Sequence, residues 1–368
     1  MVTFSEHAFR YRPRNPVIYG ILTAALFGIG APLSKLLLAD VHPLAVAAFL
    51  YIGSGIGLAC YLAAEAFAGA KRRDAEAALQ TRDVPWLAGV ILCGGFAAPL
   101  LLMVSLKATP GATAALLLNF EAVATTLIAA FLFREAVGAR VWVALAFITS
   151  SCALLSWDPA SILGLSLAAV GILVTCVSWA FDNNFSRQIS GKDPVFIVAL
   201  KGLCGGGLTM AAALFIGAPL PGPTVAAATM VLGFVSYGGL TSICFILALR
   251  GIGTARAGAL LAISPLFGGS ISLLLFHEVP DLRFLVAALI MAAGVVLLVS
   301  ERHAHPHRHA SEVHEHRHRH DDPHHEHQHS PEMPPLDASG EHSHLHVHAE
   351  LEHEHFHRPD LHHRHRHE

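Results

Sequence analysis

Histidine is the residue type whose spacing in this sequence suggests chemistry most plainly. The stretch HEHRHRHDDPHHEHQH, residues 314–329, alternates histidine with other residues and adds carboxylates. Neutral imidazole binds Zn, Ni, Co and Cu ions, and H-x-H spacing lets several rings surround one ion. No cofactor is expected to be required, but the pattern predicts that this stretch binds such metal ions. The predicted ligands are His314, His316, His318, His320, His324, His325, His327 and His329.

A second set of polar side chains lies inside long apolar segments, where a charge costs about 2.5–3.5 kcal/mol to insert. Glu121, beside Asn119, is near the middle of one segment. It could bind a proton or a cationic group, or it could be a structural acid bonded to a neighbouring helix. Three further candidates are consecutive, so their side chains must point in different directions around a helix. They are Asp182, Asn183 and Asn184.

Lys201 lies about 10 Å into its expected helix, given a rise of ~1.5 Å per residue. It could extend to the membrane surface, as long basic side chains often do. Alternatively, it could pair with Asp182 or Glu121 and attract an anionic group of a substrate. Glu135 and Glu278, which end two apolar segments, are expected to be structural.

The elements that must position these residues are apolar helices. The chain has 368 residues, of which 54% are hydrophobic and only 14% charged, whereas soluble domains have about 25% charged residues. A membrane-spanning helix needs about 20 apolar residues, and long apolar runs without alternation favour helices over a barrel. The sequence predicts an all-α, multi-pass membrane protein with ten spans. These are 16–38, 43–67, 84–106, 111–133, 141–157, 162–189, 194–215, 223–249, 254–276 and 281–300.

The last 68 residues differ from the rest in composition. Residues 301–368 hold 23 of the 26 histidines and carry a formal charge of −7, whereas residues 1–300 carry +4. Because this tail has too few apolar residues to bury a core, we expect it to be disordered without a ligand. The predicted organisation is therefore a short N-terminus at 1–15, a membrane region and the tail.

The membrane region contains an internal repeat. LKATPGATAALLLNFEAVATTLIAAFLFRE, from Leu106, matches LRGIGTARAGALLAISPLFGGSISLLLFHE, from Leu249, without a gap at a shift of 143 residues. LFGIGAPLSK, from Leu26, matches SWAFDNNFSR, from Ser178, at a shift of 152. Each copy holds five spans, 16–157 and 158–300, and because five is odd the second copy must be inverted in the membrane.

These matching segments resemble the EamA-type permeases of the drug/metabolite transporter superfamily. The resemblance rests on the two A-T/R-A-x-x-L-L openings and the two F-x-E ends, and it covers roughly residues 16–300. It implies two five-helix EamA repeats and the export or exchange of a small metabolite or drug-like solute. The second helix of such repeats often carries a basic residue near its start. Here Leu50 fills that place in the first copy and Lys201 in the second.

Other classes of protein lack support in the sequence. It contains no P-loop, Rossmann fingerprint or zinc-protease motif, so we expect a gradient-driven transporter rather than an enzyme or an ATP-driven pump. Nothing indicates a nucleic-acid partner; the expected partners are the lipid bilayer, a solute and a second copy in a homodimer. Thirteen basic residues fall in the connections on one side and two on the other. This bias predicts an inner-membrane protein with both termini in the cytoplasm.

Three roles for the histidine tail remain open at this point. It could sense cytoplasmic metal and regulate the transporter, deliver metal to a core that exports Zn, Ni or Co, or belong to a membrane sensor or scaffold without transport. No histidine lies clearly inside a span, which disfavours a metal pathway. The inverted repeat and the intramembrane acid disfavour a scaffold.

Overall fold

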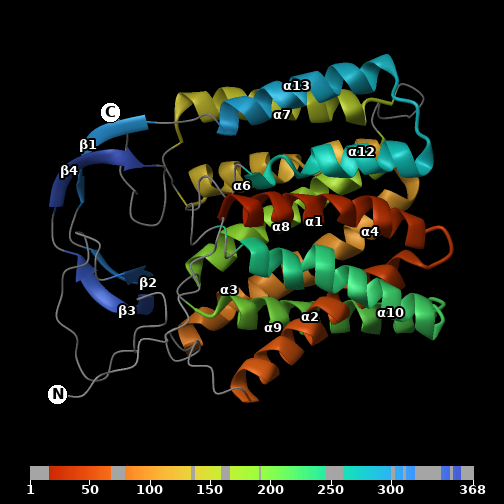
Figure 1. The fold of residues 1–368 in the computed structure, drawn as a ribbon, viewed down its shortest axis with the longest axis horizontal. Coiled ribbons are helices and arrows are strands. Elements are labelled where there is room, and N and C mark those ends of the chain that lie inside the picture. The colour runs from red at the N-terminus through yellow and green to blue at the C-terminus, as the bar shows by residue number, and fades with distance from the viewer. Residues whose placement is uncertain are drawn as a thin grey trace, which may run out of the picture.

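The membrane region is a bundle of helices (Figure 1). The computed structural model describes residues 16–67, 79–133, 137–158, 166–189, 192–245, 248 and 260–299, with the backbone of four strands between 303 and 357. The first repeat contains α1 (Pro16–Leu37), α2 (Pro43–Phe67), the 3-10 turn η2 (Thr81–Asp83), α3 (Val84–Gly89), η3 (Val90–Ala97), α4 (Ala98–Ala108), α5 (Gly111–Leu117), α6 (Phe120–Phe131) and α7 (Ala139–Ser156). The second contains α8 (Leu167–Gln188), α9 (Pro194–Phe215), α10 (Pro223–Leu232), η4 (Gly233–Tyr237), α12 (Ser264–Phe276) and α13 (Leu282–Val299).

Eight stretches of the described residues are long and apolar enough to cross a membrane. They are Val17–Leu37, Pro43–Phe67, Thr81–Ala108, Gly111–Phe131, Ala139–Ser156, Leu167–Ser186, Pro194–Phe215 and Pro223–Phe245. Two shorter apolar helices, Ser264–Phe276 and Leu282–Leu297, fall in the ninth and tenth predicted spans. The all-α membrane fold is confirmed, whereas the count of ten rests on these two shorter helices.

The packing of the helices follows the repeat in the sequence. Helix α1 packs on α12, and its counterpart α8 packs on α6. Segment η3 contacts α8 and α9, and its counterpart η4 contacts α1 and α2. Helices α2 and α9 pair with each other, as do α7 and α13 (Figure 1). The contacts of one repeat are thus repeated by the other.

Irregular helix also occurs at matching places in the two repeats. The π-helical segments η3 and η4 begin at Val90 and Gly233, which are 143 residues apart. The helix of α5 and α6 is interrupted by a turn at 118–119, and the stretch before α12 is interrupted at 262–263. At the first interruption the Glu121 N–H donates to Leu118 O at 3.1 Å, so the backbone bonds span three residues instead of four. Short π segments are frequent at functional sites.

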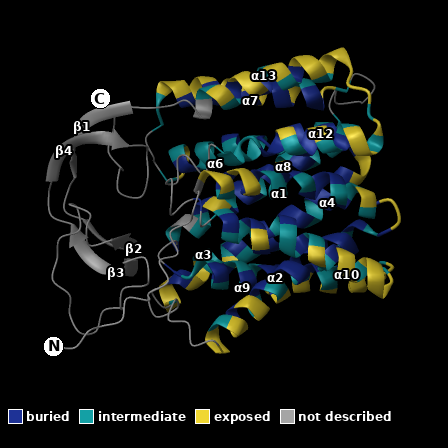
Figure 2. Ribbon diagram, viewed as in Figure 1, coloured by how far each residue is buried: buried dark blue, intermediate teal, exposed yellow. Residues whose placement is uncertain are grey.

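Exposed residues lie along the outward faces of the helices (Figure 2), and many of them are large and hydrophobic. Phe131, Phe215, Leu274 and Leu289 are each more than 70% exposed. An exposed apolar surface of this extent is expected where lipid, not water, surrounds the protein.

The tail, which its composition predicts to be disordered, has four strands among its described residues. Its described backbone forms β1 (His303–His309), β2 (Glu312–Arg319), β3 (Glu341–His348) and β4 (Leu351–His357). β1 pairs antiparallel with β4, and β2 with β3. The alternation of histidine with other residues has the two-residue period of a strand, which explains why these stretches can pair. Composition alone does not reveal that period.

Candidate functional site

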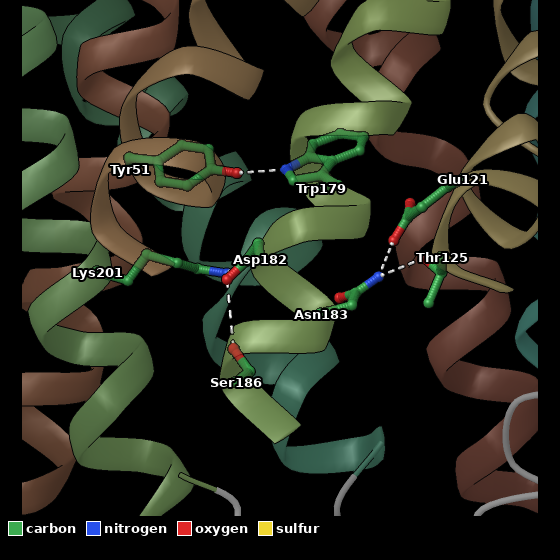
Figure 3. A network of polar contacts seen from close by, with 8 residues as sticks. All are labelled: Tyr51, Glu121, Thr125, Trp179, Asp182, Asn183, Ser186 and Lys201. Carbon is green, nitrogen blue, oxygen red and sulfur yellow. Dashed lines mark hydrogen bonds and ion pairs between the residues drawn. The ribbon is translucent and has the colours of Figure 1, made fainter. Parts of the chain in front are cut away.

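Helix α8 carries the centre of the polar site. It packs on α4 and η3 at one side and on α6 at another. Asp182 and Asn184 are buried, whereas Asn183 between them is exposed. Figure 3 shows Asp182 pointing toward α9 and Asn183 toward α6. The three consecutive residues therefore face different neighbours, as the turn of about 100° per residue requires.

On the first face, Asp182 forms an ion pair with Lys201 of α9. The distance from Lys201 Nζ to Asp182 Oδ2 is 2.7 Å, and the two side chains are 18% and 5% exposed. Ser186 Oγ donates to Asp182 Oδ1 at 3.3 Å. Of the two sequence-based interpretations of Lys201, the structure favours pairing with an acid over extension to the surface.

Glycine makes room for this ion pair. A Cβ atom on Gly94 of η3 would lie 2.1 Å from Asp182 Oδ2. A Cβ on the next residue, Gly95, would lie 2.8 Å from Lys201 O. Because neither glycine has a side chain, the π-helical backbone of η3 can lie directly against both Asp182 and the backbone of Lys201.

Aromatic residues border the ion pair. Trp179 Nε1 donates to Tyr51 Oη at 3.3 Å, one turn of α8 from Asp182 (Figure 3). The rings of Tyr51 and Tyr237 lie with their centroids 6.5 Å apart, and Tyr237 Oη is 3.0 Å from Ser34 Oγ. Sequence reasoning did not assign these residues to the site. The signal was available in part, since Tyr51, Trp179 and Tyr237 are aromatic residues with a polar atom inside an apolar span.

On the second face of α8, Asn183 contacts Glu121 of α6. Asn183 Nδ2 donates to Glu121 Oε1 at 2.7 Å and to Thr125 Oγ1 at 3.3 Å (Figure 3). Asn184 Nδ2 donates to Thr125 O at 3.2 Å. Asn119 is buried at the helix interruption, but no described side-chain hydrogen bond joins it to the others. The candidates therefore form two clusters, Asp182 with Lys201 and Glu121 with Asn183 and Asn184, on different faces of one helix.

The inverted repeat places different chemistry at equivalent positions. In sequence, Asp182 corresponds to Gly30, Lys201 to Leu50, and Gly94 to Tyr237. A Cβ on Gly30 would lie 3.2 Å from the Tyr237 ring, so the aromatic ring occupies in one half the space that Asp182 takes in the other. The polar centre, defined here by Asp182, Lys201 and Gly94 with their repeat counterparts Gly30, Leu50 and Tyr237, is charged on one side and aromatic on the other.

Two charged residues hold the turn between α4 and α5. Lys35 Nζ donates to Leu106 O at 3.2 Å and to Thr109 O, at the carboxyl end of α4. Glu278 accepts the backbone N–H groups of Gly111 at 2.7 Å and Ala112 at 3.0 Å, at the amino end of α5. Each charge complements the dipole of the helix end that it binds. These contacts support the structural role predicted for Glu278.

Glu278→Gln should weaken this attachment by about 1 kcal/mol, because it removes a negative charge from a helix amino end. We expect faster hydrogen exchange at residues 111–116, measured by mass spectrometry of the protein in nanodiscs. Glu65→Gln, at the end of α2, is the control. Unchanged exchange at 111–116 would mean that the charge of Glu278 does not hold the turn.

The predicted metal ligands fall partly within the described chain. His314, His316 and His318 lie on β2, while the other five predicted ligands, at 320–329, lie outside the described residues. In the register of β2 and β3, the Cα partners are His314 with His346, His316 with His344, and His318 with His342. The register of β1 and β4 also pairs histidines, at 303 with 357, 305 with 355, and 307 with 353. Among the residues whose side chains the structure describes, no group of three or more His, Cys, Asp or Glu could hold a metal ion.

The fold and the intramembrane polar centre define a multi-pass membrane protein of the inverted-repeat type. The sequence pattern described as the EamA-like transporter family matches residues 14–157 and 166–300. The chain therefore belongs to the EamA-like transporter family.

Two known proteins are similar to this chain. An uncharacterized transporter of Methanothermobacter thermautotrophicus strain Delta H is 28% identical over 290 residues, which cover 76% of this chain and 84% of the relative. A protein of known crystal structure is 19% identical, with a TM-score of 0.55, over 77% of this chain and 94% of the other. At that identity the second likeness concerns the fold alone.

Proposed function

We propose that this protein exports a small metabolite or drug-like solute from the cytoplasm, driven by an ion gradient. The observation that carries the proposal is the Asp182–Lys201 pair, which is held inside the bundle where the two repeats meet. Substrate sites of inverted-repeat transporters lie in this region. An ion pair can release either charge to a polar solute, and the bordering Tyr51 and Trp179 provide hydrogen-bonding aromatic surface.

Flux assays test this proposal. Full-length protein in liposomes is given a panel of radiolabelled amino acids, sugars, nucleosides and organic cations under proton or sodium gradients. We expect flux of one solute class, and at least a tenfold loss in Asp182→Asn, while Glu65→Gln keeps the rate. Flux of Zn, Ni or Co in place of an organic solute would support the metal exporter instead. No flux under any gradient would support a sensor or scaffold.

We also propose that both ends of the chain lie in the cytoplasm, and the positive-inside bias of the connections supports this orientation. Reporter fusions after residue 300 in a bacterial host test it. Alkaline phosphatase activity at that position, which requires export, would contradict a cytoplasmic tail in the inner membrane.

For the tail we propose metal-dependent regulation of flux. The support is the register of the strands, in which six pairs of histidines are Cα partners. Imidazole is a ligand of Ni and Zn, and the H-x-H spacing places several histidines within each short stretch. Ni or Zn should therefore change the flux of full-length protein, but not of a chain that ends at Ser300. Equal responses of the two proteins would remove the regulatory role.

A further inference from the structure

Glu121 differs from the other intramembrane acid in its partners. Asp182 has a cation at 2.7 Å, whereas Glu121 has only neutral partners among the described residues, with the amide of Asn183 at 2.7 Å. It lies in the first turn of α6, directly after the interruption at 118–119, and it is only half-buried. A carboxylate without a cation in a membrane is costly unless an ion neutralises it.

The surrounding groups do not supply that neutralisation. The charges that act on Glu121 through space are Asp182 and Lys201, and these already neutralise each other. From α8, Cys176 directs its thiol to the carbonyls of Leu117 and Leu118 at 3.7 Å. The phenol of Tyr51 is neutral near pH 7 and so adds no positive charge.

The helix that packs on α6 from the other side adds no opposite charge near Glu121. Its described titratable residues are Arg140 and Cys152. Arg140 begins α7, and so lies beside the end of α6 at Phe131, one helix length away from Glu121. Cys152 is a buried neutral thiol.

We propose that Glu121 is the coupling-ion site of the transporter, that the ion is a proton, and that this site is separate from the ion pair that receives the solute. The inference rests on the proposed transport function, but it concerns a different face of α8. A proton fits better than Na⁺ because a metal ion needs several oxygen ligands. Here the nearest partner of the carboxylate is an N–H donor.

The connection between the two sites is a single peptide unit. Asp182 and Asn183 are adjacent, yet one binds Lys201 and the other binds Glu121. A proton that neutralises Glu121 weakens its bond from Asn183, because hydrogen bonds to a charged acceptor are about twice as strong as those to a neutral one. A rotation of α8 that follows this change must also move Asp182 relative to Lys201. Proton binding and solute binding would thus be linked through one rigid element.

Carbodiimide labelling tests the site without knowledge of the solute. Dicyclohexylcarbodiimide modifies protonated carboxyl groups within membranes, and the full-length protein in nanodiscs can be labelled from pH 5 to pH 9. We expect mass spectrometry to locate the modification at Glu121, with a yield that falls at least tenfold across this range. Na⁺ at constant ionic strength should not change the yield. Glu121→Gln should lose the label and Glu65→Gln should retain it.

Each other outcome contradicts the proposal in a distinct way. Protection by Na⁺ at constant pH would make Glu121 a sodium site. Labelling of other carboxyls without Glu121, at every pH, would make Glu121 a structural acid. The labelling is measured on the wild-type protein, so poor folding of a variant does not affect it. If Glu121 is labelled but the protein shows no solute flux, the proton site is supported and the proposed transport function is contradicted.

Discussion

Lys201→Met should cost about 3–5 kcal/mol of folding stability, the range expected when one partner of a buried ion pair is removed. Asp182 is 5% exposed and has its nearest cation at 2.7 Å, so the variant leaves an uncompensated carboxylate inside the bundle. Thermal unfolding in detergent should show the loss, and solute flux should fall with it.

The double variant Lys201→Met/Asp182→Asn should recover most of the lost stability but not the flux. It removes both charges at once, and an uncharged pair of similar size is often as stable as a buried ion pair. Lys107→Met, on an exposed lysine near the end of α4, is the matched control. If the double variant were as unstable as Lys201→Met, a lost charge partner would not explain the single variant.

Gly233→Ala should be among the most damaging substitutions of one small residue by another. The added Cβ would lie 1.8 Å from Leu50 O and 2.5 Å from Leu50 C, so the conflict is with the backbone of α2, which cannot turn away. Overpacking typically costs about 1–3 kcal/mol, and we expect a value at or above the upper end. The unfolding temperature and the yield of monodisperse protein measure it.

Gly207→Ala provides the comparison within the same bundle. Gly207 lies on α9, and a Cβ there would meet nothing within 4 Å. Its substitution should be neutral or slightly stabilising, because alanine is the better helix former by about 1 kcal/mol. Similar unfolding temperatures for the two variants would show that η4 and α2 can separate without cost.

The positions of the spans and the inverted repeat are predictable from the sequence because both depend on local patterns. The length of each apolar run determines where a helix can span the membrane. The matches at shifts of 143 and 152 residues relate α6 to α12 and α1 to α8, and the packing of α1 on α12 and of α8 on α6 follows that relation. The partner of Lys201 is not predictable in this way. Asp182 and Glu121 are both acids within apolar spans, and the direction in which each points depends on how α8 is rotated against α6 and α9.

The irregular helices are also invisible in the sequence. Val90–Ala97 and Gly233–Tyr237 are apolar or small residues that would suit an α-helix, and both segments pack closely against the opposite repeat. In the tail, low hydrophobicity predicts disorder, and the alternation of histidines has the two-residue period of the four strands that the structure describes.

The different residues at equivalent positions of the two repeats affect the relative free energies of the inward-facing and outward-facing states of the carrier. In an inverted-repeat carrier the second orientation arises when the repeats exchange conformations. Two identical repeats would make the orientations degenerate, and an unloaded carrier would face each side half of the time. Here Asp182, Lys201 and Gly94 correspond in the repeat to Gly30, Leu50 and Tyr237. An exchange of conformations between the repeats therefore does not restore an equivalent set of contacts. A difference of 1.4 kcal/mol between the orientations already corresponds to about a tenfold preference. Under the proposed transport function, the empty carrier would therefore have a preferred resting side, and binding of the solute and the coupling ion would change that preference.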